Sequence, residues 1–229
     1  MVDDRRSDRD AHESRTGSDS VRAARTLVDC GEVDVVVSDL DGVLRVFDDG
    51  LWDRLDQELG ADPGTSFAAI LGHPVLADVI RGRAGHARWR ELAVEHLSSV
   101  GTDPGRADAA VREWADTPAV VDQAVLTLLT GARELGLPVF VFTNGTDRVR
   151  EEIEALGLGT LIGEGGRFLL NSADLGHAKP EHAAFRLAQQ RVHDVIGRKV
   201  DPARVLFLDD SCGHVRAAQQ FGWRALHHG

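Results

Sequence analysis

The sequence predicts an α/β fold in which helices flank a parallel sheet and one helical segment is inserted after the first strand. Short apolar segments alternate with helical patterns from residue 33 onward, which is typical of βαβ units. The strongest of these segments end in polar residues, as expected of strands that are buried on both faces of a parallel sheet. Residues 47–117 break this alternation, because they show helical patterns and no convincing strand.

Four segments and a short fifth one are expected to form the sheet. The first is the β-branched run 33–37, which is followed by Ser38 and Asp39. The other expected strands are 138–142, 167–170, 204–208 and 224–226. Of these, 167–170 is the weaker pattern and 224–226 is the shortest.

Helices are predicted between these strands wherever apolar residues recur at helical spacing. In the core they are expected at 120–135, at 147–156 and from 181 to 190 after Pro180. The insertion has candidate helices at 52–60, 75–80, 87–100 and 106–115. We therefore expect a core of residues 31–46 and 118–229, a helical cap over 47–117, and a charged, disordered tail over 1–30 in which 22–28 has helical character.

The composition excludes several classes of protein. With 42% hydrophobic and 28% charged residues, the 229-residue chain can bury a core. No apolar run approaches the ~20 residues of a membrane helix, and the net charge of −11 argues against a nucleic-acid or anionic-membrane partner. We expect a cytoplasmic protein, monomeric or homodimeric, whose Cys30 and Cys212 are free thiols.

Polar residues gather where the expected strands end. They are Asp39, Asp41 and Gly42 after the first strand, Thr143 and Asn144 after the second, Asp209 and Asp210 after the last strong one, and Lys179 before a helix start. Because ligands of open parallel sheets bind at the carboxyl ends of the strands, these groups are expected to converge. Crowded carboxylates need a cation, and oxygen ligands favour Mg²⁺.

These residues, in this order, resemble the motifs of the haloacid dehalogenase (HAD) superfamily of phosphohydrolases. The similarity runs from Val33 to the C-terminus, and the insertion lies where that superfamily places a helical cap of its first type. The motifs look most similar to those of sugar-phosphate phosphatases and of the phosphatase half of soluble epoxide hydrolases. The resemblance implies a HAD-like core with a Rossmann-like parallel sheet, and a Mg²⁺-dependent phosphatase acting on a small phosphorylated metabolite.

The resemblance also implies a role for each residue. Asp39 would be the nucleophile that forms an aspartyl-phosphate, and Asp41 the general acid and base. Gly42, Thr143, Asn144 and Lys179 would bind the phosphoryl group, with Thr143 and Lys179 also counted as catalytic. The metal would be held by Asp39, the backbone carbonyl of Asp41, Asp209 and Asp210.

Two alternatives stay open, and two others are argued against. A phosphosugar mutase would keep all of these motifs, and a catalytically silent binding or regulatory member of the superfamily would keep the fold. A dehalogenase would not need Asp41, so its presence argues against that activity. A phosphonatase would need a cap lysine, and residues 47–117 contain none.

Two further features concern the substrate and the metal. Arg81, Arg83, Arg88 and Arg90 form either a cationic rim over the site or a solvated helix face. His214 stands where many relatives carry Asn or Asp, so metal affinity is expected to be weaker than usual.

Overall fold

A five-stranded parallel sheet forms the centre of the computed structural model, which describes residues 19–48 and 50–229. Its strand order is β5-β4-β1-β6-β7, and every neighbouring pair is parallel. The strands are β1 (Val35–Ser38), β4 (Val139–Thr143), β5 (Leu169–Asn171), β6 (Val205–Asp209) and β7 (Arg224–His227). The strands formed by the three clear apolar runs of the sequence therefore lie side by side, with β1 between β4 and β6.

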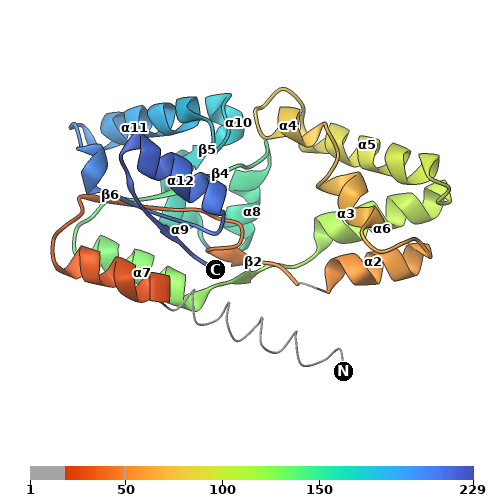
Figure 1. The fold of residues 1–229 in the computed structure, drawn as a ribbon, viewed down its shortest axis with the longest axis horizontal. Helices are drawn as coiled ribbons and strands as arrows, with labels where there is room; N and C mark the ends of the chain where they lie inside the picture. Colours follow the sequence, from red (N-terminus) through yellow and green to blue (C-terminus); the bar gives the residue numbers. More distant parts are fainter. Residues whose placement is uncertain (1–18, 49) are drawn as a thin grey trace.

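Helices cover both faces of this sheet (Figure 1). One face packs against α7 (Gln123–Glu134), α8 (Val149–Ala155), α9 (Gly159–Ile162) and the helix at 19–29. The other face packs against α11 (His182–Ile196) and α12 (Cys212–Phe221). Short turns complete the core, namely η1 (Glu164–Gly166), α10 (Ser172–Leu175) and η2 (Pro202–Arg204). The predicted α/β class with a parallel sheet is confirmed.

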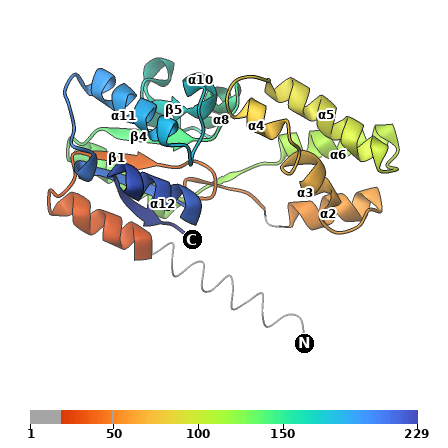
Figure 2. The same ribbon diagram turned by 45° about the horizontal axis from the view of Figure 1, so that its top comes forward.

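The inserted helices pack around a hydrophobic cluster of their own, to one side of the sheet (Figure 2). They are α2 (Leu51–Leu59), α3 (Thr65–Ile70), α4 (Leu76–Val79), α5 (His86–Ser99) and α6 (Pro104–Asp116). The chain enters and leaves them through β2 (Arg45–Val46) and β3 (Val120–Val121), which pair antiparallel. These helices are called the cap below.

Several elements differ from the expectation, among them α12, which was not predicted. Residues 19–29 are helical, and Ala24 and Val28 pack in the core, which shortens the predicted tail; residues 1–18 lie outside the described part. Residues 120–121 form β3 rather than the start of a helix, and α3 was not predicted. Among the described residues, no helix is both long and apolar enough to cross a membrane.

Candidate active site

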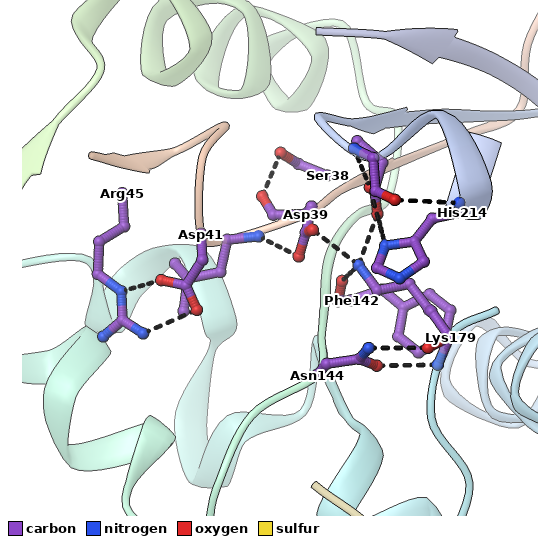
Figure 3. Close-up of polar contacts among 11 residues, drawn as sticks. Ser38, Asp39, Asp41, Arg45, Phe142, Asn144, Lys179 and His214 are labelled. Atoms are coloured by element: carbon purple, nitrogen blue, oxygen red, sulfur yellow. Dashed lines mark hydrogen bonds and ion pairs between the residues drawn. The ribbon is translucent and has the colours of Figure 1, made fainter. Parts of the chain in front are cut away.

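The carboxyl ends of three adjacent strands place the predicted site residues together. Asp39 directly follows β1, while Thr143 and Asp209 are the last residues of β4 and β6. Because β1 lies between β4 and β6, these ends meet at one edge of the sheet. Lys179, from the segment between α10 and α11, reaches into the same place (Figure 3).

Lys179 is the electrostatic centre of this edge. Its side chain is 0% exposed, and its Nζ lies 2.8 Å from Oδ2 of Asp39 and 2.6 Å from Oδ2 of Asp209. The same Nζ donates a hydrogen bond of 2.9 Å to the carbonyl oxygen of Phe142. One buried ammonium thus holds two carboxylates from different strands.

Burial and charge set the ionisation of this group. Burial raises the pKa of Asp39 well above its usual range, although the positive charge of Lys179 opposes this effect. Burial also opposes ionisation of Asp209, but a hydrogen bond from His214 and the charge of Lys179 hold the pKa of Asp209 below its usual range. Although burial acts against it, the two aspartates raise the pKa of Lys179, which stays protonated.

Asn144 fixes the backbone of Lys179. Its Oδ1 accepts a hydrogen bond of 2.8 Å from the backbone N–H of Lys179, and its Nδ2 donates one of 2.9 Å to the carbonyl oxygen of Lys179. Both the oxygen and the nitrogen of the Asn144 side-chain amide therefore bind the backbone of Lys179. The side chain of Asn144 therefore positions Lys179, and the phosphate contact that the resemblance implied for Asn144 stays a prediction.

Asp41 points away from this cluster (Figure 3). Its carboxylate accepts two hydrogen bonds from Arg45, at 2.5 Å from Nε and 3.0 Å from Nη2. Nη1 of Arg45 donates to Glu152 on α8 at 2.8 Å. Arg45, on β2, was not anticipated from the sequence, where an arginine four residues after Asp41 carries no recognisable pattern.

Gly42 brings the backbone close to Asp210. Its φ is +79°, a conformation that favours glycine, and a Cβ at this position would overlap the carboxylate of Asp210. The side chain of Asp210 therefore lies against the loop that follows β1. Burial and the nearby charge of Asp209 raise the pKa of Asp210.

The donor set fits a hard divalent cation. Asp39 and Asp209 bring two carboxylates to one place, where Lys179 supplies one buried positive charge, whereas the predicted ligand Asp210 is not part of this group. Oxygen atoms of Asp39 and Asp209 and a ring nitrogen of His214 all lie within 4.8 Å of one another. Nδ1 of His214 is 3.0 Å from Oδ1 of Asp209, so the histidine orients this carboxylate, as partners of metal-binding carboxylates commonly do. Residues of this kind suit Mg²⁺.

Comparison with known proteins identifies the family. The family model for haloacid dehalogenase-like hydrolases matches residues 33–222. The chain belongs to this family. No curated protein matches the sequence of this HAD-like hydrolase.

Solved structures share the fold of this hydrolase at low sequence identity. The magnesium complex of the HAD family enzyme bt-2542 from Bacteroides thetaiotaomicron has a TM-score of 0.61 and 21% identity, with 85% of this chain and 92% of that chain covered. Its wild-type complex with magnesium and inorganic phosphate has a TM-score of 0.58 and 20% identity, covering 85% and 93%. The L-2-haloacid dehalogenase from Xanthobacter autotrophicus has a TM-score of 0.53 and 21% identity, covering 84% and 76%. At these identities the comparison shows the fold, and the fold is shared by enzymes of different activity.

A cavity of about 630 Å³ separates the cap of the hydrolase from the carboxyl edge of its sheet. Asp41 and Asn144 line it from the core, and Trp52 and Trp89 line it from the cap. Such a volume is typical of small-molecule sites. Asp39, Lys179 and Asp209 are not among the lining residues, so the cavity meets the site through Asp41 and Asn144.

The cavity lining does not include the arginine cluster of the cap, which is Arg81, Arg83, Arg88 and Arg90. Arg81 forms an ion pair with Glu181 of the core. The partner of Arg83 is Asp78, and Arg88 pairs with two glutamates of its own helix. The solvated-face interpretation thus describes Arg83 and Arg88, whereas Arg81 connects the cap to the core.

Proposed function

We propose that this HAD-like hydrolase is a Mg²⁺-dependent phosphatase that cleaves small phosphomonoesters through an aspartyl-phosphate on Asp39. The observation that supports this proposal most is that two aspartates occur two residues apart: Asp39, whose buried carboxylate is held by Lys179, and Asp41. The nucleophile alone would serve a dehalogenase as well. Phosphoryl transfer from an ester releases an alkoxide, and protonating this leaving group needs the second, proton-carrying residue.

The first half-reaction transfers the phosphoryl group to Asp39. An Oδ atom of Asp39 attacks phosphorus, and the bond between phosphorus and the ester oxygen breaks. Asp41, in its protonated form, gives a proton to the departing oxygen, for which it must turn from Arg45 toward the site. Thr143, which is 1% exposed at the end of β4, donates its hydroxyl to a phosphoryl oxygen, assisted by backbone N–H groups near Asn144.

The second half-reaction restores the enzyme. A water molecule attacks phosphorus, the bond to Asp39 breaks, and the carboxylate of Asp41 takes the proton from the water. Throughout, Lys179 balances charge on Asp39 and on the phosphoryl group. Asp39, Asp209, Asp210 and the Asp41 carbonyl would hold Mg²⁺, which would supply the charge neutralisation that lets one anion approach another. The repulsion that it would offset is roughly 4 kcal/mol at 4 Å and a dielectric constant of 20.

Phosphate release tests this proposal. An aryl phosphate and a panel of alkyl, sugar and nucleotide phosphates are incubated with Mg²⁺ or with a chelator. We expect Mg²⁺-dependent release that falls about 10³-fold or more in Asp39→Asn, the scale of loss on removing a nucleophile. Asp53→Asn, an exposed aspartate of α2, is the matched control and should keep full activity.

Other products would overturn the proposal. Halide release from a 2-haloacid would show a dehalogenase, and interconversion of sugar phosphate isomers without free phosphate would show a mutase. A folded protein that binds phosphomonoesters and turns over none of them would be a silent binding member.

A further inference from the structure

The cavity above the site has an aromatic wall on its cap side. Trp89 and Trp114 meet edge to face with their ring centroids 4.7 Å apart, and His86 stacks on Trp114 at 5.8 Å. Trp52 and Phe47 line the same space. Five ring-bearing side chains, from α2, α5, α6 and the segment after β2, thus surround one volume.

Apolar surface makes up most of the lining of this cavity. Nε1 of Trp89 donates to the carbonyl oxygen of Ile70 at 2.9 Å, so this ring presents carbon atoms to its surroundings. His86 is 6% exposed, and burial lowers its pKa, which keeps the ring neutral near pH 7. The lining as a whole therefore favours an apolar group over the row of hydroxyl groups on a sugar.

The cavity also lacks a free positive charge among its described lining residues. Arg45 is its one lining arginine, and its guanidinium is already shared between Asp41 and Glu152. A second phosphate or a carboxylate on the substrate would find no unpaired cation among the described lining residues. This charge balance disfavours bisphosphates and phosphorylated acids.

We infer that the phosphomonoester taken by this site carries an uncharged, apolar, ring-bearing organic group, which occupies the aromatic cavity while the phosphate lies at Asp39. The inference rests on the proposed phosphatase function and narrows its substrate class from sugar phosphates to aryl-bearing esters. Aromatic side chains contact ring ligands edge to face or offset-stacked, as Trp89 and Trp114 already contact one another. A cavity of about 630 Å³ is large enough to enclose such a group.

Three primary-alcohol phosphates test the class with leaving groups of similar reactivity. They are 2-phenylethyl phosphate, hexyl phosphate and glucose 6-phosphate, each measured with Mg²⁺ as kcat/KM. Burying one aromatic ring predicts a value for 2-phenylethyl phosphate about 10- to 100-fold above that for glucose 6-phosphate, and above that for hexyl phosphate. Equal or better use of glucose 6-phosphate would overturn the inference, and equal or better use of hexyl phosphate would overturn its aromatic part.

Variants locate the preference in the cavity. Trp52→Ala and Phe47→Ala each remove one lining ring, and we expect each to lower the ratio of kcat/KM between 2-phenylethyl phosphate and glucose 6-phosphate about tenfold. Leu135→Ala is the control, because Leu135 is 64% exposed and outside the cavity lining. Circular dichroism confirms that each variant is folded, and a ratio unchanged in both folded ring variants would overturn the inference.

A binding measurement separates this inference from the proposed function. Calorimetry compares 2-phenylethylphosphonate with hexylphosphonate, neither of which can be hydrolysed, in the presence of Mg²⁺. If no ester is cleaved but the aryl phosphonate binds more tightly, the phosphatase proposal fails and the cavity assignment stands. If esters are cleaved but the phosphonates bind equally, the cavity assignment fails and the phosphatase proposal stands.

Discussion

Replacing Lys179 by Met removes the single ammonium between Asp39 and Asp209. The side chain is 0% exposed, and both carboxylates are within 2.8 Å of its Nζ. At that distance and a dielectric constant of 20, each attraction is about 6 kcal/mol before desolvation is counted. Removing one partner of such a buried pair commonly costs about 3–5 kcal/mol, a large share of a typical total of about 5–15 kcal/mol.

The loss should depend on pH in a defined direction. Without Lys179 the pKa of Asp39 in the folded protein rises still further above its value in the unfolded chain. The folded state then takes up a proton first as the pH falls, so the destabilisation is largest at high pH and shrinks as the pH falls through the folded-state pKa.

Urea unfolding in the presence of chelator measures this effect at pH 8 and pH 5.5. The chain has one other lysine, Lys199, which is exposed, so Lys199→Met is a matched control. We expect Lys179→Met to lose about 3–5 kcal/mol relative to Lys199→Met at pH 8 and less at pH 5.5. Equal stability of the two variants at pH 8, or a gap that does not narrow at pH 5.5, would refute the reasoning.

Three further variants test other contacts. Gly42→Ala strains a backbone at φ +79° and displaces Asp210, so the Mg²⁺ concentration for half-maximal phosphate release should rise about tenfold, and an unchanged value would remove Asp210 from the ion's site. Arg45→Met frees Asp41 from its bidentate partner and should lower kcat about tenfold with a shifted pH–rate profile, whereas wild-type kinetics would exclude a positioning role. Burial lowers the pKa of His228 in the folded protein, so the unfolded chain binds the proton first as the pH falls through about 6.5. The free energy of unfolding of the wild type should therefore drop more between pH 7.5 and pH 5.5 than that of His228→Gln. Parallel pH curves for the two proteins would contradict this.

The sheet and its polar ends could be predicted because their signals are local. The run 33–37 and the segments 138–142 and 204–208 are β-branched or apolar enough to indicate buried strands without knowledge of their neighbours. Once these strands are parallel and adjacent, the positions of Asp39 and Asp209 at one edge follow from topology. Short elements have no such signal: β3 is two residues long, and the helix after it begins where the Asp122 side chain accepts hydrogen bonds from two backbone N–H groups.

The contacts that tune the site could not be predicted, since they join residues by side-chain reach rather than by spacing. Arg45 contacts Glu152 across 107 positions of sequence, and the pattern of neither segment indicates this pair. His214 was noted as a departure from relatives, but its hydrogen bond to Asp209 depends on the orientation of α12. The aromatic wall likewise required the packing of the cap, because Trp52, Trp89 and Trp114 each lie on a different helix.

The placement of the tryptophans makes the protein its own optical probe. The chain has four tryptophans and no tyrosine, so its near-ultraviolet emission comes almost entirely from indole rings. Trp52, Trp89 and Trp114 line the cavity, while Trp223 is buried against Phe185 and Phe207 on the far side of the sheet. Fluorescence quenching by a small solute will therefore distinguish two components. Emission from the three cap tryptophans will change when a ligand occupies the cavity, and emission from Trp223 will not.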